Sequence, residues 1–512
     1  IQLLEKIATY MELKGENTFK VSAYRKAAQS LEIDERPLDE IKDVTELRGI
    51  GKGVGDVINE YRDKGESSTL KAPQEEVPEG LVPLLKIQGL GSKKIAKLYQ
   101  ELQIIDKESL QKACEKGEVS KLSGFAKKTE QNILEAVKAM GAKKDSYPID
   151  QMRGLNNEII DFIKKLEHVD NYSSAGSFRR YKEKSKDLDF IISTTQPLEV
   201  QQQLLNIPNK VKEVAVGDTK VSLELSYDDE TIGVDFRLIE PKAFYHTLQH
   251  FTGSKDHNIR IRQLAKERNE KVSEYGIEQA DGTLLQFQSE EEIYHHFDVS
   301  WISPAMREDG SEFDKDLSNI ISLEDINGDI HMHTTYSDGA NSIREMVEAN
   351  IAKGYKFMVI TDHSQSLKVA NGIAAIHQSF NQSEDEIMKR LEVACKNPYV
   401  RHIAHPTGRI IGRRPGYKPN IEKLMKLAEE TNTILEINAN PKRLDLNAET
   451  VRKYPNVKLT INTDAHHTNH LEFMKYGVAT AQKGFVAKDR VVNALSREEF
   501  KSLIENNIKL RK

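Results

Sequence analysis

The chain has 512 residues, of which 30% are charged and 38% hydrophobic, and its formal net charge is −6. This length predicts three or more domains, and without an 18-residue apolar run we expect no membrane span. The only two cysteines, Cys114 and Cys395, lie far apart, and we see no signal peptide, so we expect a reducing, cytoplasmic environment. The negative charge is not typical of a nucleic-acid-binding protein, so any contact with DNA would need local basic patches.

Residues 1–140 are predicted to be helical, and they contain three similar turns, at 47–55, 87–96 and 122–129. Each turn resembles a helix-hairpin-helix, in which glycine lets the backbone approach a phosphate and the next helix N-terminus binds it. One Gly-x-Gly turn is usually an ordinary connection between helices, but two good copies and one degenerate copy favour sequence-independent DNA binding. The candidate DNA-binding residues in these turns are Gly49, Gly51, Gly53, Gly89, Gly91 and Lys93.

Two aspartates, Asp187 and Asp189, stand at the start of an apolar run that predicts a strand. On a strand, side chains two residues apart share a face, so both carboxylates could hold a hard divalent cation such as Mg²⁺. The alternative is that both are solvent-facing strand residues. A third aspartate, Asp235, lies in the strand-like run 231–239, and the trio favours a two-metal site for phosphoryl transfer. Upstream, Gly176-Ser177 could bind a phosphate through backbone N–H groups and a hydroxyl.

Gly176-Ser177 followed by Asp187-x-Asp189 resembles the nucleotidyltransferase signature of family X DNA polymerases. The run 250–254, His-Phe-Thr-Gly-Ser, resembles that family's sugar-reading motif, with His in place of Tyr. The resemblance implies Asp187, Asp189 and Asp235 as catalytic metal ligands for Mg²⁺ or Mn²⁺. The nucleotide-binding residues that it implies are Gly176, Ser177, Arg180, His250, Phe251, Gly253 and Asn258. It also implies that Arg262 contacts the template strand; a packed core histidine remains the alternative for His250.

The same resemblance covers about residues 1–313 and suggests their organisation. It implies a small DNA-binding domain at 1–75, fingers at 76–145, a palm at 146–240 and a thumb at 241–313. Within the palm we expect a helix at 156–166 and strands at 188–193, 212–216, 220–227 and 231–239, forming a small mixed sheet with helices on one face. Some family members carry a lyase lysine after the first hairpin, but Val57 stands there, so we do not predict lyase activity.

After an acidic, turn-rich linker at 314–327, residues 328–512 place histidines and aspartates at the ends of apolar strands. In a parallel β/α barrel such strand ends converge on one mouth, and mixed His/Asp clusters suit Zn²⁺ or Mn²⁺. One such histidine could be structural, but six together with two aspartates favour a metal centre. Arg409, Arg413 and Arg414 could contact DNA phosphates, or could form an ordinary solvated loop.

These motifs resemble a PHP (polymerase and histidinol phosphatase) domain, a distorted (βα)7 barrel with two or three Mn²⁺ or Zn²⁺. The ligands that the resemblance implies are His331, His333, Asp338, His363, His377, His405, Asp464 and His466. The family adds a glutamate ligand between the motifs at His363 and His377, but that short interval contains no glutamate. A deletion or a missing segment explains the gap, and Glu436 is a candidate substitute.

The predicted fold class is therefore multidomain α+β and α/β, with helix-hairpin-helix, palm, thumb and PHP parts. The predicted function is a DNA polymerase that fills short gaps in repair. Its expected partners are gapped or primer–template DNA and deoxynucleoside triphosphates, and we expect it to act as a monomer. The PHP part would add 3′–5′ exonuclease action, with cleavage at abasic sites or of 3′-phosphates also conceivable. Two alternatives are a DNA-binding or end-bridging factor with idle metal sites, and a nucleotidyltransferase for RNA or small molecules. The repeated hairpins argue against the latter.

Overall fold

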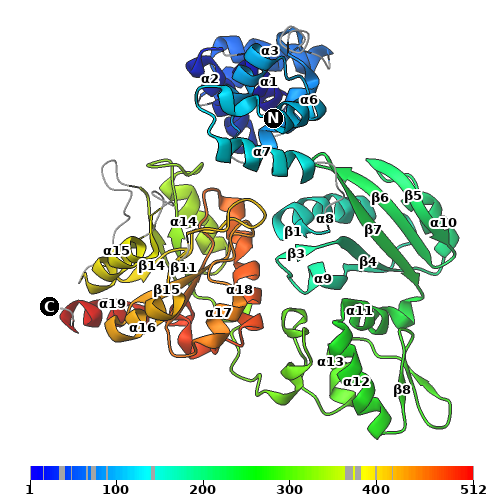
Figure 1. Cartoon of the computed structure of the whole chain (residues 1–512). Coiled ribbons are helices and arrows are strands. Elements are labelled where there is room, and N and C mark those ends of the chain that lie inside the picture. The colour runs from blue at the N-terminus through cyan, green and yellow to red at the C-terminus, as the bar shows by residue number, and fades with distance from the viewer. Residues whose placement is uncertain are drawn as a thin grey trace. The chain divides into compact units, whose positions relative to one another are not determined.

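The computed structural model describes residues 2–14, 16–33, 38, 41–47, 49–64, 67–70, 77–87, 90–139, 145–363, 373–374, 382–397, 400–417 and 419–510. Its contacts divide the chain into two compact units, Ile1–Lys143 and Lys144–Lys512, coloured from blue to red along the chain in Figure 1. Among the described residues, no helix is both long and apolar enough to cross a membrane.

The described part of the first unit is helical and has no strand, as predicted. Its α-helices are α1 (Gln2–Lys14), α2 (Thr18–Ile33), α3 (Lys52–Lys64), α5 (Ser92–Leu102), α6 (Lys107–Glu115) and α7 (Lys127–Ala139). One apolar core joins α1, α2 and α3, and a second joins α5, α6 and α7. Ile50, in the glycine turn that leads into α3, belongs to the first core, and Leu90, in the turn that leads into α5, belongs to the second.

The second unit begins with a mixed five-stranded sheet in the order β2-β4-β7-β6-β5, and Figure 1 labels β4, β7, β6 and β5 of it. The strands are β2 (Asn171–Ser174), β4 (Asp187–Ser193), β5 (Lys210–Gly217), β6 (Lys220–Tyr227) and β7 (Glu230–Ile239). Only the β4–β7 pair is parallel. The four predicted palm strands are confirmed, but the predicted helix at 156–166 is wrong at its start: α8 (Ile149–Ile163) begins earlier, because Ile149 and Met152 in its first turn are buried.

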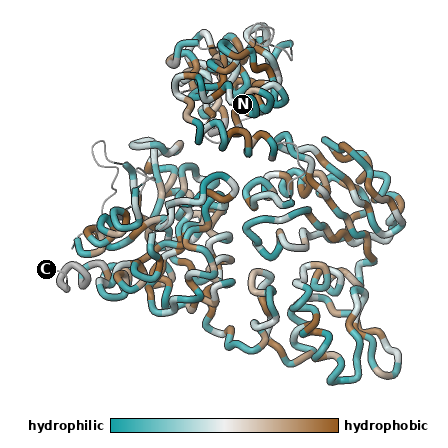
Figure 2. Tube along the Cα trace, viewed as in Figure 1, coloured by the Kyte–Doolittle hydropathy of each residue, from teal (hydrophilic) through white to brown (hydrophobic). Residues whose placement is uncertain are grey.

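Polar and apolar residues alternate along the central strands of this sheet, as Figure 2 shows for β6 and β7. On β4, Leu188, Phe190 and Ile192 pack against α8 and α10 (Pro197–Leu204). Ile191 faces the opposite side, where it packs against α11 (Phe244–Thr252). Because side chains alternate between faces, the aspartates of β4 lie on the Ile191 side, away from α8 and α10.

Two small elements flank this sheet, and a helical region follows it. The short strands β1 (Tyr147–Pro148) and β3 (Lys184–Ser185) pair antiparallel, and the short helix α9 (Gly176–Arg179) directly precedes β3 in the chain. Beyond α11, a separate apolar core joins α12 (Lys255–Glu267) and α13 (Glu290–His296) to a small antiparallel sheet. That sheet consists of β8 (Lys271–Val272), β9 (Ile277–Glu278) and β10 (Leu284–Leu285), and sequence patterning did not predict its two-residue strands.

The C-terminal part alternates parallel strands with helices. The strands are β11 (Gly328–Met332), β12 (Phe357–Ile360), β13 (Ile373–Ala374), β14 (His402–Ile403), β15 (Ile434–Asn438) and β16 (Leu459–Asn462). The helices are α14 (Ile343–Ala352), α15 (Glu384–Lys396), α16 (Ile421–Thr431), α17 (Ala448–Lys453), α18 (Met474–Lys483) and α19 (Arg497–Leu510).

These strands follow the cyclic neighbour order of a β/α barrel. β11 pairs with β12, and β13, β14, β15 and β16 pair in sequence order, all in parallel. A parallel bridge between Met332 and Ala465 joins the two sheets. In the described part of the chain, β12 and β13 are the outer strands of this series. The interval 364–372, from which the sequence leads us to expect a strand and a helix to be missing, lies outside the described residues.

Candidate active sites

Three aspartates meet where β4 and β7 run in parallel. Asp187 and Asp189 share a face of β4, and the register places Asp235 directly opposite Asp189. Lys220 on β6 lies with its Nζ 2.8 Å from Asp235 Oδ2. The structure thus brings together the three carboxylates singled out from the sequence, in the geometry on which their predicted role depends.

The electrostatics of this trio favour a bound cation. Burial, together with the negative charges of Asp187 and Asp235, raises the pKa of Asp189 to about 7. Burial and Asp235 also raise the pKa of Asp187. Carboxylates that disfavour one another's ionisation are stabilised when positive charge lies among them. The oxygen donors fit a hard divalent metal.

Gly176 fits tightly beneath this cluster. Its φ is +60°, and a Cβ added there would lie 2.0 Å from Asp189 Oδ2. The preceding Ala175 N–H donates to the Asp189 carbonyl oxygen at 2.7 Å, and the Ser177 hydroxyl donates to Ser185 Oγ at 2.8 Å. Only glycine therefore suits the turn that brings Ser177 close to the aspartates.

Arg180 is buried and directed toward the end of α11. Its Nη1 donates to the Thr252 carbonyl oxygen at 2.5 Å, and its Nε lies 3.5 Å from Glu308 Oε1. Glu308 also pairs with Lys182 at 3.3 Å and with Lys483 of α18 at 2.7 Å. These contacts engage Arg180 within the protein, and its role at a nucleotide phosphate stays a prediction.

The end of α11 holds the predicted sugar-reading motif. The His250 side chain remains 29% exposed, with Nε2 3.9 Å from Glu274 Oε2, whereas the nearby His257 is fully buried between Glu312 and Tyr294. His250 is therefore half-buried, and its contact with a nucleotide sugar stays a prediction. Gly253 adopts a positive φ of +67° and is followed by a cis peptide bond.

The neighbours of this motif have structural contacts of their own. Asn258 accepts from Gln249 Nε2 at 2.9 Å and donates to the His250 carbonyl oxygen at 2.7 Å, which fixes the end of α11. Phe251 lies beneath the Arg237 guanidinium, 4.5 Å from the ring centre. Arg262 is exposed on α12. The nucleotide and template contacts of Phe251, Asn258 and Arg262 stay predictions.

The two good glycine turns share one backbone pattern. At the first, the N–H groups of Val54 and Gly55 donate to the Gly51 carbonyl oxygen, and at the second those of Lys94 and Ile95 donate to Gly91. Added Cβ atoms at three of the glycines would meet nothing within 4 Å: Gly51, Gly53 and Gly91. The fold itself leaves this space open, which agrees with an approaching phosphate. Gly49 has a φ of +95°, Lys93 is exposed, and Gly89 lies outside the described residues.

Val57, where some family X members carry a lyase lysine, is only 6% exposed in the core beneath the first turn. An apolar side chain buried there can supply no amine. The expectation that this position does not support lyase chemistry agrees with its place in the core.

In the C-terminal part, seven of the eight predicted metal ligands lie near the ends of β11, β12, β14 and β16; the eighth, His377, is outside the described residues. Two groups could each hold an ion, with ligand atoms within 4.8 Å of one another: His331, His333 and Asp464, and His333, Asp338 and His363. His333 belongs to both, because its Nε2 lies 3.3 Å from Asp464 Oδ1 and its Nδ1 3.4 Å from Asp338 Oδ1.

The remaining two predicted ligands adjoin this cluster. His466 Nε2 lies 3.5 Å from Asp338 Oδ2, and its ring stacks 4.3 Å from that of His333. The His405 ring centre lies 5.8 Å from that of His331. Neither residue belongs to the two groups above, and their roles as metal ligands stay predictions. The mixture of imidazole and carboxylate donors fits Zn²⁺ or Mn²⁺.

Glu436, proposed from sequence as a substitute ligand, lies instead behind His331. Its Oε1 is 2.7 Å from His331 Nδ1, which leaves His331 Nε2 to face Asp464 at 3.3 Å. Its other contacts are the His405 N–H and the amides of Asn438 and Asn462. Although burial opposes the shift, His331 lowers the pKa of Glu436 to about 2. This carboxylate therefore orients His331, a predicted ligand.

Asp362 was also missed as a supporting residue. It accepts hydrogen bonds from the Thr334 N–H at 2.7 Å, the Thr334 hydroxyl at 2.5 Å and the Ser337 hydroxyl at 2.6 Å. These bonds tie the loop that carries Asp338 to the end of β12. The sequence signal was present, since Asp362 directly precedes the ligand His363 at a strand end.

The three arginines that follow His405 differ in their surroundings. Arg409 forms a bidentate ion pair with Glu183, at 2.6 and 3.2 Å. Arg414 donates to the Gly408 carbonyl oxygen at 2.8 Å, and Arg413 is exposed. Two of the three predicted phosphate-binding arginines are thus engaged within the protein. Arg443, which sequence reasoning did not single out, lies with Nε 3.4 Å from Asp464 Oδ2.

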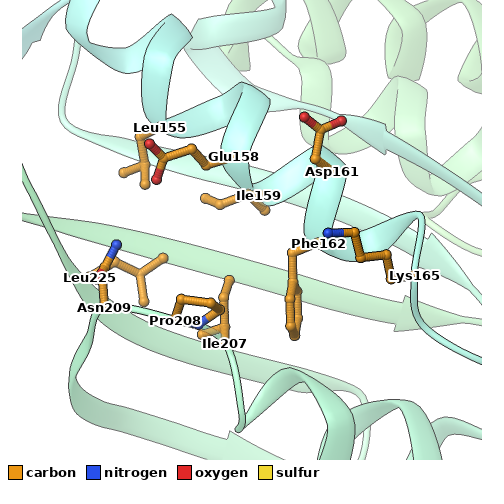
Figure 3. Close-up of a pocket in the computed structure, with 10 residues that line it drawn as sticks. All are labelled: Leu155, Glu158, Ile159, Asp161, Phe162, Lys165, Ile207, Pro208, Asn209 and Leu225. Carbon is orange, nitrogen blue, oxygen red and sulfur yellow. The ribbon is translucent and has the colours of Figure 1, made fainter. Parts of the chain in front are cut away.

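A cavity of about 310 Å³ lies elsewhere, between α8 and the segment 207–209 (Figure 3). In Figure 3, Phe162 of α8 points toward Ile207 and Pro208 across the cavity. None of its lining residues is a predicted site residue. This cavity is therefore separate from both carboxylate clusters.

Three family models match the chain. They are described as a helix-hairpin-helix domain at residues 1–67, a DNA polymerase beta thumb at 247–308 and a PHP domain at 329–397. Each falls on a part whose architecture the sequence motifs predicted.

Known proteins are similar along the whole chain or along a part of it. "DNA polymerase/3'-5' exonuclease PolX" of Bacillus subtilis is 49% identical over 564 residues, covering 99% of each chain. "Repair DNA polymerase X" of African swine fever virus (isolate Pig/Kenya/KEN-50/1950) is 29% identical over 127 residues, covering 24% of this chain and 69% of the relative.

The length of the first alignment bears on the missing glutamate. Because 564 exceeds the 512 residues of this chain by 52, the Bacillus relative has internal positions without a counterpart here. From the motifs we expect a gap of this kind between His363 and His377. On its near-complete match to the Bacillus protein, the chain belongs to the family X DNA polymerases that carry a C-terminal PHP domain.

Proposed function

We propose that this protein is a DNA-directed DNA polymerase that fills short gaps during repair, and that its PHP part is a metal-dependent 3′–5′ exonuclease. The observation that carries the first activity is the parallel register that sets Asp235 beside Asp189, with Asp187 on the same face. The cluster around His333 supports the second activity. The full-length likeness to a protein named for both activities agrees with this assignment.

At the polymerase site the residues mainly position reactants. Asp187 and Asp189 would hold Mg²⁺ or Mn²⁺, and Asp235 would bind the ion nearest the primer 3′-hydroxyl. Bound divalent metals supply the charge that activates this hydroxyl and stabilises the leaving oxygen. Gly176 and Ser177 would hold the outer phosphates of the deoxynucleoside triphosphate through N–H and hydroxyl donors. Positioning and charge neutralisation account for most of phosphoryl-transfer catalysis, so this arrangement needs no further acid or base.

At the PHP site, His333 would be shared by two ions of Mn²⁺ or Zn²⁺, with a third possible near His405. Metal ions there supply Lewis acidity toward a phosphodiester. Glu436 fixes the orientation of His331, and Asp362 fixes the loop bearing Asp338. Arg443 stands beside Asp464 and would neutralise a non-bridging oxygen of the scissile phosphate.

The remaining parts of the proposal concern organisation and partners. We propose the domain boundaries 1–75, 76–145, 146–240, 241–313, 314–327 and 328–512, acting as a cytoplasmic monomer on gapped or primer–template DNA. Gly49, Gly51, Gly53, Gly91 and Lys93 would contact DNA backbone phosphates. Gly89, the sixth residue predicted for these turns, lies outside the described residues.

A single substrate tests both activities. A 5′-labelled primer in one-nucleotide-gapped DNA is incubated with Mn²⁺, with and without deoxynucleotides. The proposal expects extension with nucleotides and shortening without them. It expects Asp235→Asn to remove extension alone and His333→Ala to remove shortening alone. Ends carrying an abasic residue or a 3′-phosphate reveal whether cleavage extends to those groups.

The same experiment separates the alternatives. Binding without extension or shortening would establish an end-bridging factor and overturn the proposal. Extension without shortening would mean that the shortened interval after His363 has silenced the PHP site. That outcome would leave the polymerase assignment intact and remove the nuclease from it.

A further inference from the structure

An exposed aromatic side chain stands beside the PHP metal cluster. Tyr336 is 79% exposed and lies two residues before Asp338, a member of that cluster. Single exposed apolar residues are common on protein surfaces. Tyr336 differs from them because its backbone is rigidly held and because it borders the open side of a candidate catalytic centre.

The loop that presents Tyr336 is pinned on both sides. The Thr335 N–H donates to the Asn341 carbonyl oxygen at 2.9 Å, and the Ser337 N–H donates to that of Thr334 at 3.0 Å. The side chains of Thr334 and Ser337 both donate to Asp362. Hydrogen bonds that do not involve the Tyr336 ring therefore hold the loop backbone in place. The need to hold this loop does not explain why an aromatic residue stands at its tip.

Burial shows from which side a substrate reaches the cluster. His331, His333 and Asp464 are at most 4% exposed, and Glu436 fills the space behind His331. Asp338 is 54% exposed and His466 35% exposed at their side chains. A phosphodiester must therefore approach over Asp338, which is the side where the Tyr336 loop lies.

We propose that Tyr336 is a stacking platform for a nucleobase at the single-stranded 3′ end of DNA, placing the terminal phosphodiester at the metal cluster. The inference rests on the proposed exonuclease function and deepens it, since it names the feature of the substrate that is recognised. Stacking on an aromatic ring is tolerant of sequence because every base has a π-face. The platform would hold the end of any sequence, which an enzyme that trims 3′ ends requires.

The test compares two ends of the same oligonucleotide, one with a normal 3′-terminal nucleotide and one whose terminal nucleotide lacks its base. Tyr336→Ala should lower kcat/KM for the normal end by about 5- to 150-fold, as expected for one lost base stack. It should leave kcat/KM for the baseless end unchanged. Tyr336→Phe, which retains the ring, should match the wild type on both ends. Ile351→Ala, at a residue 66% exposed on α14, is the control for loss of an exposed apolar side chain.

A binding measurement decides the proposal independently of turnover. An oligonucleotide ending in 2-aminopurine should be quenched on binding to the wild type and to Tyr336→Phe, and much less with Tyr336→Ala. Equal loss of activity on both ends, or equal quenching by all three proteins, would overturn the platform. A wild type that quenches the probe but shortens neither end would instead contradict the exonuclease assignment, while the platform would stand as a binding site.

Discussion

Gly176 offers a sharp test of how the polymerase site is built, because it binds no metal itself. In Gly176→Ala, the new Cβ would stand 2.0 Å from Asp189 Oδ2, whereas ordinary contacts begin at 3.4 Å. The left-handed φ of +60° adds about 1–2 kcal/mol of strain for alanine. The Asp189 carboxylate must therefore move by about 1 Å or more, and a misplacement of that size costs about 100-fold in rate.

The assay is single-turnover filling of a one-nucleotide gap at saturating Mg²⁺ and nucleotide. We expect the rate for Gly176→Ala to fall about 100-fold, with DNA affinity unchanged because the hairpins lie far along the chain from this residue. The 3′–5′ exonuclease activity of the same preparation serves as an internal reference. It should be retained, because Gly176 contributes nothing to the cluster around His333.

The matched control is Gly233→Ala on the neighbouring strand. Gly233 pairs in register with Asp187, but its added Cβ would lie an ordinary 3.6 Å from the Asp187 Cβ. We expect its rate to stay within about threefold of the wild type, as is usual for a substitution without a clash. If Gly176→Ala is as active as Gly233→Ala, then Asp189 is not held against Gly176 during catalysis, and the reasoning is refuted.

Three further predictions concern other parts of the chain. Glu436→Gln removes the charge that orients His331 and should weaken metal binding at the PHP site by about 10- to 100-fold. The measurement is the metal content after dialysis against limiting metal, and an unchanged content would contradict this role. Gly91→Ala adds a methyl group that meets nothing in the fold, so the melting temperature should stay unchanged. Fluorescence anisotropy with labelled DNA should show about 10-fold weaker binding. Unchanged affinity would mean that this turn does not contact DNA. Glu290 is paired with the fully buried Arg307, and although burial opposes the shift, Arg307 lowers its pKa to about 2 from 4.5. The ionised Glu290 therefore stabilises the fold by about 3 kcal/mol above pH 4.5, and this stabilisation is lost as the pH falls toward 2. In denaturant unfolding, Glu290→Gln should be less stable than the wild type at pH 7, and the difference in unfolding free energy should shrink in acid. A difference that stays constant with pH would contradict the ion pair.

Local sequence was sufficient to predict those features that depend only on the spacing of residues along one helix or strand. Asp187 and Asp189 share a face because a strand alternates its side chains. The histidines of the PHP part lie at strand ends, where a parallel β/α arrangement gathers them. The helical character of the N-terminal unit and the four palm strands also follow from hydrophobic period, and the structure confirms them.

Other features depended on contacts between distant segments. The parallel register of β4 and β7 sets Asp235 beside Asp189, and no pattern in either strand specifies it. Arg180 and Arg409 pair with Glu308 and Glu183, and neither partner could be read from the residues around the two arginines. A side chain on a long flexible stem takes whichever partner the fold brings near, so its sequence neighbours do not determine its contact.

The sequence alone thus determined which donors the chain offers and on which strands and turns they stand, because periodicity and turn chemistry are local. The tertiary structure decided which donors converge and which only support them. Glu436 shows the difference: the absence of the family's glutamate made it a candidate substitute ligand, but its carboxylate accepts from His405, Asn438 and Asn462 and orients His331. A buried carboxylate must satisfy its hydrogen bonds where the fold supplies donors, and only the assembled strands place those donors.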